Sequence, residues 1–248
     1  MRRFEPAAAA SDQDLLSLYD ADDRPAPAGR PWVMLNMVAS LDGATAVDGV
    51  SGGLGGTADR QVFGVIRTVP DVIVVAAGTV RAEDYGPPVA RPEAVDRRQA
   101  RGQAPVPVVA VVTGSASLDG SSRLFADHHR PLIITTDDAP ADRVAALAPV
   151  ADIVTAGTTT VDPTAALQVL AARGHQVVLL EGGPTLNGQF VAQGLVDELC
   201  LTVAPMLVAG SSKRVAVGGD VAEPLGLTLT HVLEHDNTLL LRYRRPTM

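Results

Sequence analysis

The chain has 248 residues, a hydrophobic fraction of 46% and a formal charge of −8, which suits one large or two small globular domains. The acidic balance argues against nucleic acid as the main partner, because a surface that follows phosphates needs an excess of basic residues. No apolar run approaches the roughly 20 residues that a membrane span needs, and no N-terminal segment resembles a signal peptide. We therefore expect a cytoplasmic protein without membrane contact. A single cysteine, Cys200, and histidines without metal-ligand spacing predict no metal site.

Apolar periodicity predicts alternating strands and helices along most of the chain. Residues 1–30 are rich in Ala, Asp and Pro and are predicted to form an N-terminal arm with a short helix at 12–19. Runs of strand length occupy residues 32–38, 71–76, 106–112, 131–135, 152–155 and 176–180. Helical spacing occupies residues 58–68, 142–147, 164–173 and 185–193. Gly78 and Thr79 are predicted to form a turn and a helix N-cap, and residues 86–105 a long surface loop.

The order of these elements predicts an α/β fold. Alternating strands and helices are typical of a mostly parallel sheet that is covered on both faces. The last three predicted strands, at 198–203, 225–233 and 238–243, have no helix between them, and residues 235–237 resemble a hairpin turn. We therefore expect one domain over residues 31–248, whose sheet ends in antiparallel strands.

The sequence Glu-Gly-Gly-Pro-Thr at residues 181–185 ends one predicted strand and begins a helix. Glycines allow a sharp turn and close approach of a ligand, and Pro184 suits the first helical turn. The free N–H groups of a helix start favour an anion such as a pyrophosphate. A plain strand-to-helix turn is also compatible with these residues. Glu181 favours the ligand interpretation, because an acid at the carboxyl end of a parallel strand faces the crevice of such a sheet.

Two other predicted strands also end in polar clusters. Asn36, Ser40 and Asp42 could hold a hydroxylated ligand or could close their strand with an Asx-turn. Glu83 and Asp84 follow the next strand, as partners of a helix dipole or as acids facing a crevice. The carboxyl ends of parallel strands meet at one edge of a sheet, so we expect all three clusters to line a single cleft.

Several short motifs occur in order between residues 31 and 245. They are Asn36, Ser40-Leu41-Asp42-Gly43, Ser51, Arg67, Gly78-Thr79-Val80, Glu83, residues 181–186, residues 195–199 and Ala204-Pro205. This ordered set resembles the RibD C-terminal domain family, the reductase domain of bifunctional riboflavin-biosynthesis proteins. The resemblance implies a dihydrofolate-reductase-like fold, NADPH as the cofactor and a homodimer. The zinc-binding patterns of the family's deaminase half are absent from the sequence, so we expect a stand-alone reductase.

The resemblance also implies roles for individual residues. The cofactor-binding residues would be Thr79, Val80, Thr113, Ser115, Glu181, Gly182, Gly183, Pro184, Thr185 and Leu186. The substrate-binding residues would be Asn36, Ser40, Ser51, Arg67 and Asp84, with Arg67 on the substrate phosphate. Glu83 stands where the family carries an active-site aspartate, and it is the expected catalytic group, with Asp42 as a second candidate. We expect this acid to orient the acceptor or to relay a proton.

The implied reaction is the NADPH-dependent reduction of the ribosyl group of a 5-amino-6-(5-phosphoribosylamino)uracil-type substrate to ribityl. Two alternatives stay open at this point. One is a reductase of another heterocycle, such as a dihydropterin or dihydrofolate, because Gly53-Leu54-Gly55 replaces an aromatic segment of the family's substrate loop. The other is a non-catalytic homologue, which would bind NADPH without turning over a phosphorylated pyrimidine or a pterin.

Overall fold

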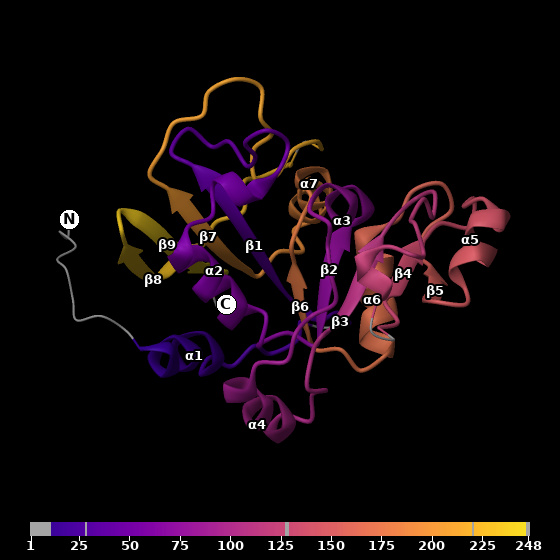
Figure 1. Cartoon of the computed structure of the whole chain (residues 1–248), viewed down its shortest axis with the longest axis horizontal. Helices are drawn as coiled ribbons and strands as arrows, with labels where there is room; N and C mark the ends of the chain where they lie inside the picture. Colours follow the sequence, from indigo (N-terminus) through magenta and orange to yellow (C-terminus); the bar gives the residue numbers. More distant parts are fainter. Residues whose placement is uncertain (1–10, 28, 127–128, 220, 247–248) are drawn as a thin grey trace.

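One sheet of nine strands runs through the described part of the chain (Figure 1). The structure is a computed structural model that describes residues 11–27, 29–126, 129–219 and 221–246. The strands are β1 (Trp32–Ser40), β2 (Val72–Ala76), β3 (Val108–Val112), β4 (Leu132–Thr135), β5 (Asp152–Thr155), β6 (Val177–Leu180), β7 (Glu198–Ala204), β8 (Thr228–His235) and β9 (Thr238–Arg244). Their order is β5-β4-β3-β2-β6-β1-β7-β9-β8.

Every pairing from β5 across to β7 is parallel, whereas β9 pairs antiparallel with both β7 and β8. The turn between β8 and β9 contains Asp236 and Asn237, both with positive φ, a conformation that these short polar residues tolerate. The predicted fold class, a mostly parallel sheet that ends in antiparallel strands, is therefore confirmed.

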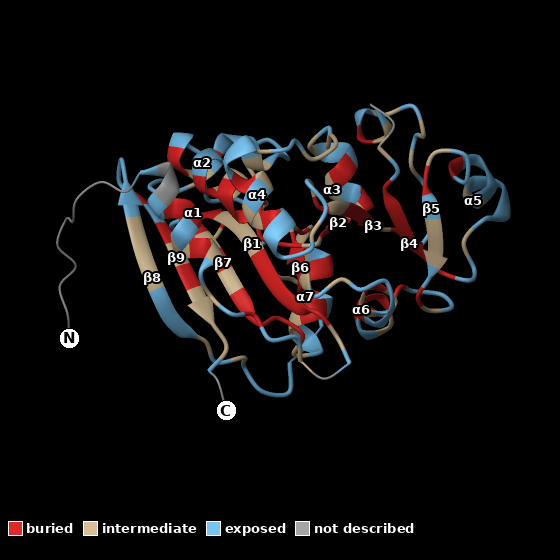
Figure 2. Cartoon of the chain, turned by 90° about the horizontal axis from the view of Figure 1, so that it is seen from below, coloured by how far each residue is buried: buried red, intermediate tan, exposed pale blue. Residues whose placement is uncertain are grey.

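Helices cover the parallel part of the sheet on both faces (Figure 2). They are α1 (Asp12–Asp20), α2 (Thr57–Ile66), α3 (Ala77–Ala82), α4 (Pro92–Ala100), α5 (Ala141–Leu147), α6 (Pro163–Ala172) and α7 (Pro184–Ala192), with short 3₁₀ turns at Ser51–Gly53 and Arg123–Phe125. Trp32 and Met34 of β1 pack with α1 and α2, while Val33 and Leu35 pack with α6 and α7. Alternate residues of a strand point to opposite faces, so a continuous apolar run is what a sheet covered on both sides requires.

The structure corrects two local predictions. Residues 92–100, which were predicted to lie in a long loop, form α4. Its fully buried Arg98 donates hydrogen bonds to the carbonyl oxygens of Ala104, Thr68 and Pro70, and these tertiary bonds hold a helix that lacks a marked apolar stripe. The predicted N-cap at Gly78-Thr79 is also wrong, because α3 already begins at Ala77.

The segment before β1 packs against the sheet rather than standing apart from it. Leu15, Leu16 and Tyr19 of α1 are buried in the same cluster as Trp32 and Met34. The first ten residues of the predicted arm lie outside the described residues. The boundary at residue 30 therefore stays a prediction, although α1 contributes to the core of the domain.

A buried ionic cluster joins this segment to the antiparallel strands. Glu198 at the start of β7 accepts hydrogen bonds from Arg24 Nε at 3.0 Å, Arg242 Nε at 2.7 Å and Trp32 Nε1 at 3.2 Å. Its side chain has no exposed surface. Burial by itself would raise the pKa of Glu198, but the two arginines outweigh this and hold the pKa below its ordinary value.

The described ranges contain no helix long and apolar enough to cross a membrane, and no group of three or more acidic, histidine or cysteine side chains placed to hold a metal ion. Cys200 is buried on β7 beside Glu198, and burial raises the pKa of its thiol. A thiol in this state is a poor nucleophile.

We predict that Glu198→Gln lowers the free energy of unfolding by about 3–5 kcal/mol, because it removes the carboxylate that two buried guanidinium groups share and leaves only Arg242 with a second acid, Asp22. Since the folded-state pKa is depressed, the carboxylate's contribution is present above the unfolded-state pKa of about 4.3 and is lost as the pH falls below it. Urea unfolding between pH 3 and 7 measures both effects.

The matched control is Glu93→Gln, because Glu93 is exposed and its ion pair with Arg91 is 3.3 Å long. An exposed pair contributes little, so this variant should unfold like the wild type. Equal stability of the Glu198 and Glu93 variants would contradict the prediction.

Candidate functional site

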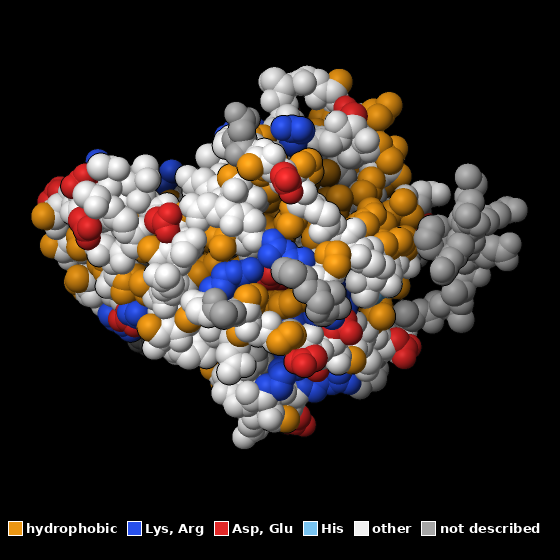
Figure 3. Space-filling model, turned by 180° about the vertical axis from the view of Figure 1, so that it is seen from behind, with side chains coloured by type: hydrophobic (Ala, Val, Ile, Leu, Met, Phe, Trp, Pro, Cys, Tyr) orange, Lys and Arg blue, Asp and Glu red, His pale blue; other side chains and the backbone are white. Residues whose placement is uncertain are grey.

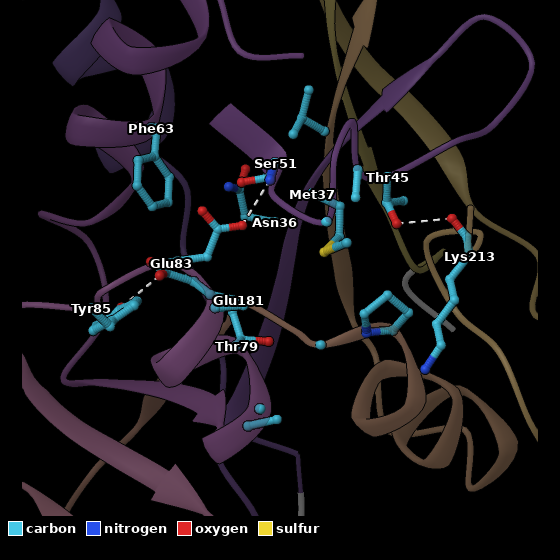
Figure 4. Close-up of a pocket in the computed structure, with 18 of the residues that line it drawn as sticks. Asn36, Met37, Thr45, Ser51, Phe63, Thr79, Glu83, Tyr85, Glu181 and Lys213 are labelled. Atoms are coloured by element: carbon cyan, nitrogen blue, oxygen red, sulfur yellow. Dashed lines mark hydrogen bonds between the residues drawn. The ribbon is translucent and has the colours of Figure 1, made fainter. Parts of the chain in front are cut away.

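A cavity of about 1360 Å³ lies at the carboxyl ends of β1, β2 and β6. Helices α2, α3 and α7 border it, and residues 208–213 of the connection after β7 close one side. Figure 4 shows Phe63, Tyr85 and Glu181 on one side of this space and Thr45 and Lys213 on the other. This is the edge of an open α/β sheet at which ligands bind.

The cavity brings together most of the residues that the sequence singles out. They are Asn36, Ser51, Arg67, Thr79, Glu83, Asp84, Glu181, Gly183, Pro184, Thr185 and Leu186. Six others do not line it: Ser40, Asp42, Val80, Thr113, Ser115 and Gly182. Val80 lies on the inner face of α3 and is buried in the core. Thr113 and Ser115 follow β3, farther along the sheet, so their expected role in cofactor binding stays a prediction.

Asp42 braces two loops at the rim of the site. Its carboxylate accepts hydrogen bonds from the Ser40 hydroxyl at 2.5 Å and from the N–H groups of Ala209 at 2.7 Å and Val208 at 3.2 Å. These bonds, the one from Ser40 first, lower the pKa of Asp42 to about 2. A carboxylate that is held ionised by its own loops favours an architectural role, so the catalytic role predicted for Asp42 and the substrate contact predicted for Ser40 have no support from the geometry.

Arg67 and Glu181 form a bidentate ion pair inside the cavity. Arg67 Nε lies 2.8 Å from Oε1 of Glu181, and Arg67 Nη2 lies 2.6 Å from Oε2. The Tyr85 hydroxyl donates to the same Oε2 and accepts from the same Nη2, both at 2.6 Å. The guanidinium also lies 4.3 Å above the ring of Phe63. Two nitrogens of Arg67 are therefore occupied within the protein, and a ligand can use only its remaining donors.

The same contacts set the ionisation of the cluster. Burial by itself would lower the pKa of Arg67, but the adjacent Glu181 carboxylate outweighs it and raises that pKa. Burial, followed by the charge of Glu181, raises the pKa of Tyr85 well above its usual value. The phenol therefore stays protonated and keeps its hydrogen bond to Glu181.

The two neighbouring acids at the end of α3 have different surroundings. Glu83 Oε1 accepts a hydrogen bond of 2.8 Å from the backbone N–H of Ser51, which fixes the carboxylate beside Asn36 (Figure 4). Asp84 lies 3.1 Å from Arg123, and both side chains are more than half exposed. Glu83 is therefore the better placed of the two to touch a bound ligand.

The start of α7 forms the other end of the cavity. Gly182 has a φ of +92°, which only glycine adopts readily. A Cβ on Gly183 would lie 2.9 Å from Oγ1 of Thr79, so a side chain at this position would displace the Thr79 hydroxyl. The N–H groups of a helix start attract anions, and Lys213 Nζ lies 3.4 Å from Oγ1 of Thr185 beside them.

The lining residues that sequence reasoning missed include Asp59, Phe63, Tyr85 and Lys213, and the two arginines Arg91 and Arg123. A signal existed for Asp59 and Phe63, because they precede Arg67 by eight and four residues and so share its face of α2. No pattern identifies Tyr85 or Lys213, because each reaches the cavity from an irregular segment.

Comparisons with known proteins agree on one family. The model of the RibD C-terminal domain matches residues 31–241. A 2,5-diamino-6-ribosylamino-4(3H)-pyrimidinone 5′-phosphate reductase from Methanothermobacter thermautotrophicus is 35% identical over 85% of this chain and 94% of its own length. A reductase of the same name from Archaeoglobus fulgidus is 29% identical over 77% of this chain and 88% of its own. The crystal structure of a pyrimidine reductase-like protein from Corynebacterium diphtheriae superimposes with a TM-score of 0.79 at 28% identity, over 88% of this chain and 93% of that one.

We predict that Tyr85→Phe lowers the free energy of unfolding by about 1–3 kcal/mol, because it removes a buried hydroxyl that bonds to two charged groups. Tyr243→Phe is the control, since no hydrogen bond of that hydroxyl occurs among the described residues. Urea unfolding at neutral pH compares the two variants. The prediction fails if the two phenylalanine variants are equally stable.

Proposed function

Because the chain belongs to the RibD C-terminal domain family, we propose that it is an NADPH-dependent reductase that converts the ribosyl group of a ribosylaminopyrimidine phosphate to ribityl. The carrying observation is the single cavity in which Glu83, Arg67 and the start of α7 meet. In this cavity the Glu83 carboxylate is held in a fixed position, Arg67 and Phe63 form a cationic and aromatic wall, and the start of α7 can bind an anion.

The residues present fit a dinucleotide cofactor. A cavity of about 1360 Å³ exceeds the usual range of about 300–1,000 Å³ for one small ligand, which leaves room for a cofactor and a substrate side by side. Gly183, Pro184 and Thr185 would hold the diphosphate at the start of α7, with Lys213 supplying positive charge. NADPH, when bound, supplies the hydride; the chain's task is to hold the acceptor carbon against it and to exclude water.

The other end of the cavity suits a phosphorylated substrate. Although the chain carries a net charge of −8, Arg67, Arg91 and Arg123 all line this space. The guanidinium of Arg91 packs against Gly64, in the space that a side chain at that position would fill. Gly64 precedes Arg67 by three residues, so the two arginines lie near each other. A local basic surface inside an acidic protein concentrates an anionic ligand where it is needed.

In the proposed reaction the hydride adds to C1′ of the ribosyl group, the bond from C1′ to the ring oxygen breaks, and that oxygen takes up a proton. Glu83 is our candidate for orienting the acceptor or relaying the proton. Its hydrogen bond from Ser51 N–H fixes its position. Glu181, paired with Arg67, would hold the wall of the site rather than transfer a proton.

We also propose that the protein is a cytoplasmic homodimer. One face of the antiparallel strands carries Leu199, Leu201 and Val203 of β7 opposite Leu239 and Leu241 of β9. Leu199 packs against the core cluster that includes α6 and α7, whereas Leu201, Val203, Leu239 and Leu241 are absent from the core clusters and only half-buried or exposed. Hydrophobic side chains gather over this part of the molecule (Figure 3). An apolar sheet face of this kind supports association with a second copy.

The reductase proposal predicts that the purified chain oxidises NADPH when given a ribosylaminopyrimidine 5′-phosphate, and does so faster than with NADH. We expect Glu83→Gln to lower kcat/KM by about 100-fold or more, because it removes an acid–base group without changing shape. NADPH binding, followed by fluorescence, should remain. Asp96→Asn, on the exposed face of α4, is the matched control.

Turnover of dihydrofolate instead of the pyrimidine would redirect the proposal to another heterocycle. Cofactor binding without turnover of either compound would make the chain a non-catalytic homologue. Unchanged kcat/KM in Glu83→Gln would remove Glu83 from the mechanism.

The dimer proposal predicts that Leu241→Glu yields a monomer, because a charge would be buried in the apolar interface. Light scattering at several protein concentrations measures the mass, and circular dichroism checks the fold. Val89→Glu is the control, since Val89 is 85% exposed and lies away from these strands. A wild type that is monomeric at all concentrations would refute the dimer.

A further inference from the structure

Three side chains spaced four residues apart on α2 and its C-cap face the cavity. Asp59, Phe63 and Arg67 all line it, as the helical repeat requires for residues i, i+4 and i+8. With a rise of about 1.5 Å per residue, the two ends of this row are roughly 12 Å apart. The row therefore offers a carboxylate, an aromatic ring and a guanidinium in a line, over a distance comparable with the length of a ribosylaminopyrimidine phosphate.

Asp59 has acceptor capacity that the protein leaves unused. The Thr202 hydroxyl donates one hydrogen bond to its carboxylate, whereas an ionised carboxylate offers about four lone-pair sites. Within the described ranges no salt bridge holds this group, in contrast to Glu181, which is paired with Arg67. Burial raises the pKa of Asp59, and the hydrogen bond from Thr202 and the charge of Arg60 offset this effect only in part.

The position of the Asp59 carboxylate is constrained by the backbone. Oδ2 of Asp59 rests against Gly55, where an added Cβ would lie only 2.6 Å from it. Thr202 lies behind it on β7, opposite Val38 of β1, and Val38 also lines the cavity. The free side of the carboxylate is thus directed toward the space in which we place the substrate.

Two substrates are compatible with the proposed reaction, and they differ at ring position 2. The 2,5-diaminopyrimidinone named for the archaeal relatives carries an amino group there, whereas the uracil form carries a carbonyl oxygen. Both carry an N–H at position 3. A carboxylate accepts hydrogen bonds and cannot donate them, so it binds the amino and N–H edge in a bidentate manner but meets a lone pair on the carbonyl of the uracil.

We propose that Asp59 is a specificity-determining residue that binds the 2-amino edge of the pyrimidine and discriminates against the 2-oxo form. This inference rests on the proposed function and deepens it. In the bound orientation the phosphate lies toward Arg67, the ring edge lies at Asp59, and Phe63 contacts the part between them. Discrimination arises from both the attractive contact with one substrate and the repulsive contact with the other.

The test compares kcat/KM for the two substrates. Wild-type protein should prefer the 2-amino substrate by about 100-fold or more, as sites do that hydrogen-bond a donor which the analogue lacks. Asp59→Asn keeps the shape and adds a donor, so it should lower kcat/KM for the 2-amino substrate, raise it for the uracil form and bring the ratio within about tenfold. The control is Asp96→Asn, at an exposed position of α4. It should leave the ratio of the two kcat/KM values unchanged.

The outcomes separate the two levels of the proposal. Turnover of neither substrate by the wild type would refute the proposed function itself. Turnover with a ratio that Asp59→Asn leaves intact, or a wild type that prefers the uracil form, would refute the role of Asp59 alone.

A test on the wild type covers the case in which the variant fails to fold. Isocytosine, the bare 2-amino-4-pyrimidinone ring, should inhibit turnover competitively at concentrations at which uracil does not. Equal inhibition by isocytosine and uracil would overturn the inference.

Discussion

The ion pair between Arg67 and Glu181 is the contact on which the cavity depends. It joins the C-terminus of α2 to the carboxyl end of β6, and the Tyr85 hydroxyl attaches the segment after α3 to the same two groups. Glu181 is almost fully buried and Arg67 is partly buried, so the loss of Arg67 would leave a carboxylate in a poorly solvated place. The three elements that carry the site are thereby held at fixed distances, while the loops at the rim are braced separately through Asp42.

This arrangement divides the cavity into parts with different chemistry. One end has the open N–H groups of α7 and the only lysine of the chain, Lys213. The opposite wall is the α2 row, in which Arg67 is partly neutralised by Glu181 and Asp59 is not neutralised by any ion pair within the described residues. Because a hydride transfer demands little more than orientation in a dry space, such a site selects its substrate mainly through the fixed polar groups along its walls.

Much of this was accessible from the sequence, for a physical reason. Continuous Val, Ile and Leu runs such as those of β2 and β6 are buried on both faces, which predicts a parallel sheet with helices on either side. That topology alone places Asn36, Glu83 and Glu181 at one edge, where the cavity is found. The same reasoning failed for α4, since its helix is held by the buried bonds of Arg98 to distant carbonyl oxygens rather than by its own periodicity.

The sequence by itself determined the fold class, the family and the strand ends that form the site, because these follow from local periodicity and from ordered short motifs. Only the tertiary structure decided how the charges pair. Arg67 and Glu181 are 114 residues apart, and nothing local indicates that the arginine expected on the substrate phosphate shares its guanidinium with the acid of the Glu-Gly-Gly-Pro-Thr segment. Nor does local sequence show that the Asp42 carboxylate is hydrogen-bonded to loop residues whereas Asp59 lines the cavity. Pairing of charges depends on distances between side chains that the fold alone sets.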